Sequence, residues 1–452
     1  MADMAKLIRG PVSRHLVAQT APGIFGVGAI MSTGLVDAYF IGQLGQRELA
    51  AVAFIFPVLT ALSSLGVGVM VGVSSVVSRA LGEGNDERAT GRANLGIMLG
   101  MFAGLSVGIA LYLLRQPLFA LMQADAELLP LIDRYMRPYA IGFPILLTMM
   151  GLNGVLRGQG AAKSSTTVLI AYAAMNWLLD PILIGGGFGF SGFGIAGAAY
   201  ATIIGWNVAV VTAFVLVRRG VVPFSPASVL ARNWRSSLIA LLRVAGPAAF
   251  SNSINPVGLA VLTALIATEG QGAVAAFGAG GRVQAFASVP LLAMSGAIGA
   301  IVGQNWGAGE DDRARRALWL AVGFCLAYGL ASALLLFVLA DSFAAMFSDD
   351  PAVIREIVRY LHISVWGYAG FGAVITVNGA LNAIDRAGFA LLLSLSRVAL
   401  LMVPAAYFLR ESWGSTAIYG GELAANLVGG LVSAMIGWQV LRRGPKSPSR
   451  DA

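Results

Sequence analysis

The sequence predicts an all-α polytopic membrane protein, with twelve transmembrane helices in two pseudo-symmetric six-helix bundles. Three observations support this fold class. Of the 452 residues, 57% are hydrophobic and only 12% are charged, which excludes a soluble enzyme of ordinary composition. Apolar runs long enough to cross a bilayer follow one another along the chain. The sequence also repeats itself at a constant offset, which predicts two related halves.

Twelve apolar runs, separated by charged or Gly-rich breaks, define the predicted helices. The first six centre near Ile30, Gly66, Ser106, Leu146, Ala174 and Ile204, and the other six near Val257, Pro290, Ala327, Phe371, Ala399 and Val428. With the N-terminus inside, 21 Lys and Arg residues fall on the inner side and seven on the outer side. The positive-inside rule therefore predicts that both termini are cytoplasmic. The same bias accounts for the net charge of +8 without a nucleic-acid partner.

An internal repeat divides the chain. A shift of 225 residues superposes Pro22 on Pro247 and the loop 82–89 on the loop 307–314. Between Thr20 and Ala89, 16 of 70 positions are identical without a gap. Each half holds an even number of helices, so we expect parallel repeats with the substrate path between them. The predicted units are a bundle at 1–217, a cytoplasmic linker at 218–237, a bundle at 238–441 and a disordered tail at 442–452.

Two carboxylates lie deep in predicted helices. Asp37 follows Pro22 in the first helix, and a proline inside a membrane helix removes a backbone hydrogen bond and permits a bend. Asp180 lies four residues after Asn176, so the two side chains share a helix face. Intramembrane carboxylates are costly and usually functional, although a structural hydrogen bond between helices is the alternative. Two such groups close together favour binding of a proton or another cation.

The remaining polar and charged residues suggest less. Thr202 is a possible hydroxyl ligand, although membrane threonines usually bond their own backbone, and an interfacial aromatic belt explains Tyr139 equally well. Arg282 and Arg397 are expected to extend to an interface. Glu422 is expected near the outer end of the last helix, which leaves the deep carboxylates in the first half. Two His and one Cys predict no metal site, and the loop 157–165 fails the phosphate-loop pattern, so an ion gradient must supply the energy.

Four stretches together resemble the MATE (multidrug and toxic compound extrusion) transporters. They are LVDAYFIGQLG at 35–45, GLNGVLRGQG at 151–160, NWLLDPILI at 176–184 and VGQNWGAGEDDRARRA at 302–317. The resemblance implies twelve helices in two bundles, export of cationic drugs, and coupling to protons or sodium. It also implies that Asp37 is the essential first-helix carboxylate, that Asn176, Asp180 and Thr202 complete its polar site, and that Tyr139 is a looser match.

The resemblance is closer to one branch of that family. Pro22 matches the proline at which the first helix bends in the archaeal and DinF-like branches. The NorM-type branch carries a glutamate eight residues after the seventh-helix proline, and here Asn255 stands at that position after Pro247. The tenth helix also lacks the aspartate of that branch. We therefore expect cation coupling to be confined to the first bundle.

These observations predict an antiporter that exports amphipathic, mostly cationic organic compounds across a bacterial inner membrane. The coupling ion is expected to be H⁺ in preference to Na⁺, with no other cofactor, no enzymatic activity and a monomeric state. Met31, Phe143, Met149 and Met150 are candidates for an aromatic and Met-rich binding surface, although simple helix packing explains them equally well. The alternatives are a flippase for lipid-linked oligosaccharides of the same superfamily, a membrane-embedded enzyme, or a non-transporting accessory subunit.

Overall fold

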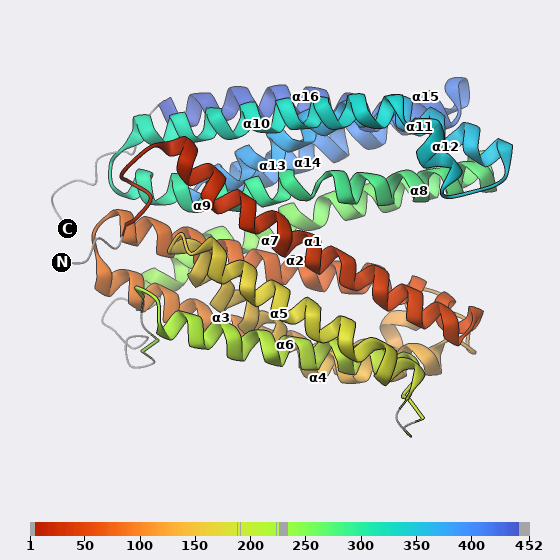
Figure 1. Ribbon diagram of the computed structural model, residues 1–452, viewed down its shortest axis with the longest axis horizontal. Coiled ribbons are helices and arrows are strands. Elements are labelled where there is room, and N and C mark those ends of the chain that lie inside the picture. The colour runs from red at the N-terminus through yellow and green to blue at the C-terminus, as the bar shows by residue number, and fades with distance from the viewer. Residues whose placement is uncertain (1–4, 188, 190, 223, 226–233, 443–452) are drawn as a thin grey trace.

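The protein is a bundle of long helices (Figure 1). The computed structural model describes residues 5–187, 189, 191–222, 224, 225 and 234–442. The first group of helices is α1 (Val12–Leu44), α2 (Gln46–Gly82), α3 (Asp86–Leu121), α4 (Leu129–Gly158), α5 (Ala162–Asp180) and α6 (Ile195–Arg218). The second group is α7 (Trp234–Ile266), α8 (Gln271–Ala287), α9 (Val289–Gly307), α10 (Asp311–Val338), α11 (Ala340–Ala345), α12 (Pro351–Ser364), α13 (Tyr368–Ala383), α14 (Ala387–Leu395), α15 (Val403–Trp413) and α16 (Ser415–Arg442).

The expected all-helical membrane fold is confirmed. Eleven helices or continuous helix pairs in the described part of the chain are long and apolar enough to cross a membrane. The count becomes twelve if α8 and α9, which meet at a bend of 43°, form one span. Two spans contain a π-helical segment, Pro181–Gly185 after α5 and Ser396–Met402 between α14 and α15. Such segments are irregular turns that often occur at functional sites.

Small residues hold the helices close together within each group. A Cβ atom added at Gly104 of α3 would lie 2.7 Å from the Cα of Pro144 in α4. One turn further along α3, a Cβ atom at Gly108 would lie 2.6 Å from the carbonyl oxygen of Ala140. Glycine is therefore required at these positions for the backbones to approach. This close packing is the usual source of stability between membrane helices, where water provides no hydrophobic driving force.

The two groups of helices meet at one end of the molecule. Gln304 of α9 accepts a hydrogen bond from the Leu7 amide at 3.1 Å and donates one to the Gly158 carbonyl at 3.0 Å. Ser75 of α2 donates to the carbonyl of Asn382 at 2.6 Å, and the Arg79 guanidinium lies 3.7 Å from the Asp385 carboxylate. Toward the other end, α1 diverges from α8 (Figure 1). The two groups also meet where α2 packs on α7, since a Cβ atom added at Gly68 would lie 2.5 Å from the Cβ of Ala249.

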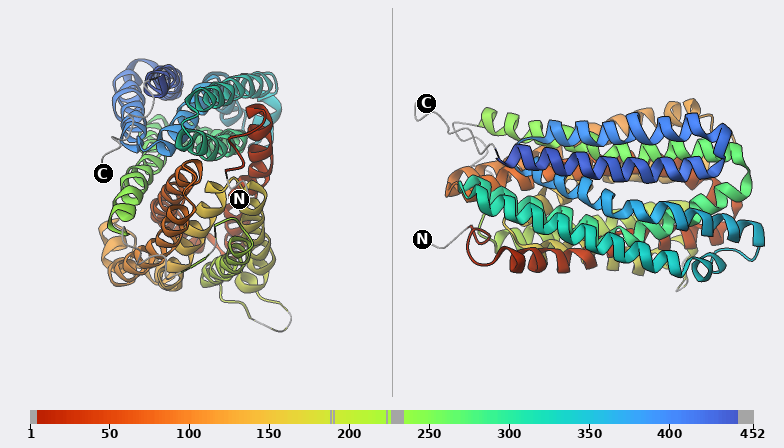
Figure 2. Two further views of the ribbon diagram at one scale, coloured as in Figure 1. Left: turned by 90° about the vertical axis from the view of Figure 1, so that its left-hand side faces the viewer. Right: turned by 90° about the horizontal axis from the view of Figure 1, so that it is seen from above.

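The start of α1 and the end of α16 lie at this same end of the molecule (Figures 1 and 2). The predicted linker 218–237 falls between α6 and the first residues of α7, and residues 223 and 226–233 of it lie outside the described residues. Of the predicted tail 442–452, only Arg442 is described, as the last residue of α16. The division into two bundles with a linker and tail stays a prediction of the sequence.

The turns that lead into α6 and α16 have the same backbone geometry. Gly194 has φ 58° and ψ −137°, and Gly414 has φ 55° and ψ −138°. A positive φ favours glycine, because other residues carry a Cβ that clashes there. Counting eight residues from each glycine reaches Thr202 in α6 and Glu422 in α16. The last helix of each half therefore places a polar side chain at an equivalent height.

Candidate ion-coupling site

Four residues predicted from the sequence converge within the first group of helices. Asp180 and Asn176 lie on α5 and are fully buried, and Thr202 of α6 is almost fully buried. The side-chain amide of Asn176 donates to Asp180 Oδ1 at 3.3 Å and to Thr202 Oγ1 at 3.5 Å. The Asp37 carboxyl of α1 interacts with the side chains of both Asp180 and Asn176. Side chains from α1, α5 and α6 thus form one polar cluster in an apolar interior.

This cluster contains unused oxygen atoms. Asp37 Oδ1, Asn176 Oδ1 and Asp180 Oδ2 are buried and make no hydrogen bond with the described residues. A buried polar atom without a partner costs free energy, so it calls for an explanation, and a bound ion or water is one. The ligand atoms that this cluster offers are carboxylate, amide and hydroxyl oxygens, which suit a proton or a hard cation. Their chemistry fits the coupling ion that the sequence predicts.

Tyr172 is a neighbour of this cluster that the sequence analysis did not single out. Its side chain interacts with Thr33 and Thr202 and lies close enough to both carboxylates to interact with them electrostatically. Tyr172 lies four residues before Asn176 and eight before Asp180. Residues at this spacing share one helix face, so the helical period is the signal by which Tyr172 could have been found.

Tyr139 of α4 is buried in the helix packing. It is 3% exposed, with its ring 5.9 Å from that of Tyr135 and 5.2 Å from that of Trp206. Of the two tyrosines on this face of α4, Tyr135 is the one that interacts electrostatically with Asp37 and Asp180. The structure therefore places Tyr139 behind the carboxylate cluster, in an aromatic layer.

Pro22 lies inside α1, fifteen residues before Asp37, and the helix continues through it. At 1.5 Å per residue this separates the two by about 22 Å along the helix. Thr20, near Pro22, donates to the sulfur of Met294 in α9 at 3.5 Å. Pro22 therefore lies where α1 crosses from the first group of helices onto the second, and the bend expected there stays a prediction.

The four candidates for a substrate surface occupy two environments. Phe143 and Met149 of α4 are at most 1% exposed and belong to the hydrophobic core. Met31 of α1 and Met150 of α4 are half-buried. Met150 also packs closely against α2, because a Cβ atom at Gly66 would lie 3.1 Å from its Cγ. A role in substrate binding for any of the four stays a prediction.

The expectation that Arg397 extends to an interface is wrong. Arg397 is 4% exposed and lies in the π-helical segment between α14 and α15. Its guanidinium donates to Asn426 Oδ1 at 2.6 Å and to Asn255 Oδ1 at 2.5 Å, and it lies over the ring of Phe371. The physical reason is that two amide oxygens and an aromatic face replace the water that an exposed arginine would use. Arg282 of α8, by contrast, is exposed, and its extension to an interface stays a prediction.

The expected confinement of buried carboxylates to the first half is also wrong. Glu422 lies two turns inside α16 and is 2% exposed. It accepts hydrogen bonds from Gln284 at 2.6 Å and from the Tyr360 hydroxyl at 3.5 Å. It also interacts electrostatically with Arg397, and this nearby cation offsets the cost of burying the carboxylate. Nothing in the sequence pattern around Glu422 signals that its partners come from α8 and α12.

Comparison with known proteins agrees with this architecture. The family model described as MatE matches residues 22–182 and again 247–408, and the two matches begin 225 residues apart (247 − 22). The chain is 35% identical over 410 residues to a protein of Shewanella oneidensis named FAD transporter, covering 90% of each chain. It is 29% identical to a probable multidrug resistance protein NorM of Deinococcus radiodurans, covering 84% of this chain and 85% of that protein.

A solved structure has the same fold. The crystal structure of the Vibrio cholerae MATE transporter VcmN in the bent form is 30% identical in sequence and superposes with a TM-score of 0.89. The match covers 96% of this chain and 97% of that one. The family model covers most of the chain in two copies, and a relative above 30% identity covers nearly all of it. The chain therefore belongs to the MATE family of multi-pass membrane transporters.

Proposed function

We propose that this transporter is a cation-coupled antiporter that exports organic compounds, and that its coupling ion binds among Asp37, Asp180, Asn176 and Thr202. The observation that carries the proposal is the buried cluster of these four side chains, in which three oxygen atoms have no partner. Two carboxylates that share a site of low dielectric do not readily both ionise. Binding of a proton, or of a sodium ion in its place, relieves this repulsion.

The position of Asp37 links ion binding to movement. Asp37 is on α1, whereas Asp180, Asn176 and Thr202 are on α5 and α6. Neutralising the cluster changes how strongly α1 is held against α5, and Pro22 provides a point at which α1 bends. The start of α1 also packs on the second group of helices, since Leu7, Val12 and Leu16 belong to the core around α9, α10 and α13. A bend at Pro22 would therefore act on the path between the two bundles.

We propose amphipathic organic cations as the first substrate class. Several relatives of this chain are named multidrug resistance or multidrug export proteins, the NorM relative among them. The exchange of an incoming coupling ion for an outgoing cationic compound needs no cofactor besides that ion. The energy comes from the ion gradient, about 2.3 kcal/mol per charge for each 100 mV. Both termini are proposed to lie in the cytoplasm, and the working unit is proposed to be a monomer.

A flavin dinucleotide is a second candidate substrate. The relative named FAD transporter is 35% identical to this chain, whereas the relatives named for multidrug resistance or export are 22–29% identical. This candidate keeps the same coupling site and changes only the cargo.

Transport assays in proteoliposomes distinguish between these two substrate classes. Purified protein is reconstituted, a pH gradient or a sodium gradient is imposed separately, and movement of ethidium and of FAD is measured in parallel. Ethidium movement without FAD movement supports the drug proposal, and the reverse supports the flavin proposal. The Asp37→Asn variant is the control, because it preserves shape and removes the ionisable group. Transport of either compound that persists in this variant, or that needs no ion gradient, would contradict the proposed coupling.

A further inference from the structure

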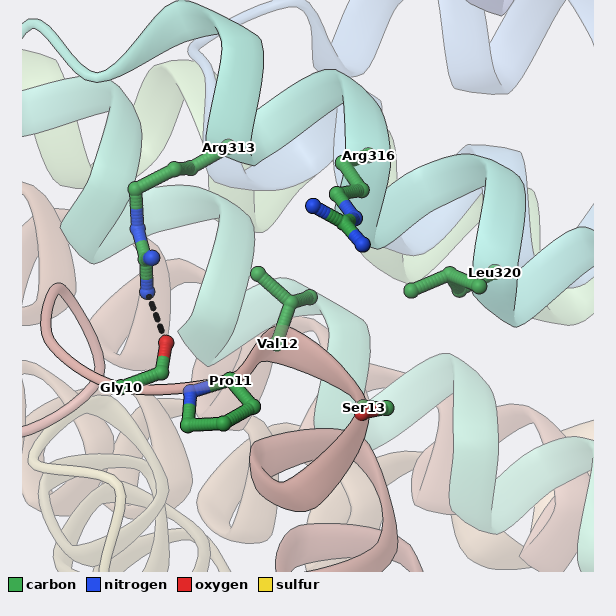
Figure 3. Close-up of a pocket in the computed structure, with 7 residues that line it drawn as sticks. All are labelled: Gly10, Pro11, Val12, Ser13, Arg313, Arg316 and Leu320. Atoms are coloured by element: carbon green, nitrogen blue, oxygen red, sulfur yellow. Dashed lines mark hydrogen bonds between the residues drawn. The ribbon is translucent and has the colours of Figure 1, made fainter.

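A pocket of about 370 Å³ lies at the end of the molecule where the two groups of helices meet. It is lined by Gly10, Pro11, Val12 and Ser13 at the start of α1, and by Arg313, Arg316 and Leu320 of α10 (Figure 3). Two arginines and no carboxylate contribute to its walls. We propose that this pocket binds the phosphate headgroup of an anionic phospholipid.

The charge of the pocket is not neutralised by the described residues around it. Arg313 donates to Asn305 Oδ1 at 2.9 Å and to the Gly10 carbonyl at 3.0 Å, both of which are uncharged acceptors. Arg316 makes no ion pair, hydrogen bond or ring contact within the described part of the chain. The neighbouring Asp312 is engaged by Arg315. Figure 3 shows the Arg316 guanidinium extending from α10 toward the start of α1.

The surroundings of the pocket suit a lipid better than a free anion. Leu320 lies one turn further along α10 than Arg316 and is 41% exposed, and Phe324 follows after another turn at 38%. On α1, Val17 lies one turn beyond Ser13 and is 67% exposed. Residues four apart share a helix face, so these apolar side chains continue both walls of the pocket away from its charged end. A headgroup with an acyl chain matches this order, because basic pockets beside membrane helices bind lipid headgroups.

The location also gives the lipid a consequence for transport. The pocket joins the start of α1 to α10, and Arg313 already bridges these two elements through Gly10. A headgroup bound to Arg316 would add a second bridge. Occupancy would therefore stabilise the arrangement in which the start of α1 lies on the second group of helices.

Lipid binding to the full-length protein in nonionic detergent tests the proposal. The probes are phosphatidylglycerol, phosphatidylcholine and inorganic phosphate, and the readout is the apparent Kd from native mass spectrometry or thermal shift. Arg316→Gln should weaken phosphatidylglycerol binding about fivefold, as expected for one basic side chain at a membrane surface. Arg14→Gln is the matched control, because it removes the same charge from an exposed residue beside Ser13 that does not line the pocket. It should change the Kd less than twofold.

Ser13→Trp is a second, independent variant. It leaves both arginines in place and fills the pocket with an indole ring, so it should also weaken phosphatidylglycerol binding about fivefold. Equal loss in Arg316→Gln and Arg14→Gln would overturn the proposal, because it would show general attraction between charges. Undiminished binding in Ser13→Trp would do the same. Binding of inorganic phosphate without preference for phosphatidylglycerol over phosphatidylcholine would overturn the choice of a lipid.

Discussion

Gly23 of α1 lies directly against Ala293 of α9: a Cβ atom added at Gly23 would lie 3.4 Å from the Cβ of Ala293. The two residues belong to different halves of the chain, and Gly23 follows Pro22. The contact therefore joins the proposed bending point of the first helix to the second group of helices. A cycle that exposes the substrate path to each side of the membrane in turn must separate such contacts at one stage.

A disulfide at this contact should arrest transport. In a Cys325→Ala background, Gly23→Cys combined with Ala293→Cys places two Cβ atoms near the 3.5–4.5 Å separation that disulfides need. Oxidation should abolish ion-driven export, and a reductant should restore it. Transport is measured in proteoliposomes, with each single-cysteine variant as control. Full transport by the cross-linked protein would mean that α1 and α9 stay together throughout the cycle.

Pro22→Ala should reduce export strongly while membrane insertion stays intact. Alanine restores the backbone donor that proline lacks, so α1 gains a hydrogen bond and resists bending. The measurement compares initial export rates at matched protein levels, and we expect a loss of at least tenfold. Pro247→Ala, at the repeat-related position in α7, is the natural comparison. Wild-type rates in Pro22→Ala would remove bending at this residue from the mechanism.

Asp37→Asn should abolish ion-linked export, because an amide cannot take up and release a proton. Asp180→Asn should weaken coupling or shift its pH dependence, since the two carboxylates titrate as a pair. Glu422→Gln is the comparison in the second half, and it should keep coupled export. Ion flux and substrate flux are recorded together in reconstituted vesicles. Coupled flux in Asp37→Asn, or its complete loss in Glu422→Gln, would move the coupling site to the second bundle.

The Arg397 and Glu422 pair should show a stabilising interaction. Arg397→Met leaves Asn255 and Asn426 without their donor and leaves Glu422 without its nearby cation, so we expect a loss of about 3 kcal/mol or more. In the Arg397→Met, Glu422→Gln double variant the uncompensated carboxylate is gone, and part of this loss should be recovered. Thermal denaturation in detergent measures Arg397→Met, Glu422→Gln and the double variant. Additive losses would mean that the two side chains do not interact.

Composition and periodicity determined the fold class and much of the proposed coupling site. Apolar runs must become helices in a bilayer, because only a helix or a closed barrel satisfies the backbone there. Asn176 and Asp180 were paired in advance because their spacing puts them on one face of α5. Asp37 was singled out because a carboxylate inside an apolar run is costly without a partner.

Only the tertiary structure decided which side chains from distant helices meet. An interfacial position was expected for Arg397 because arginine in a membrane helix usually extends to an interface. In the structure its guanidinium instead contacts Asn255, Asn426 and Phe371, which lie on three other helices. Glu422 is buried for the same reason, with partners on α8 and α12. A helical period shows which residues share a face, but it does not show what that face contacts. That contact depends on how helices far apart in the chain pack against one another.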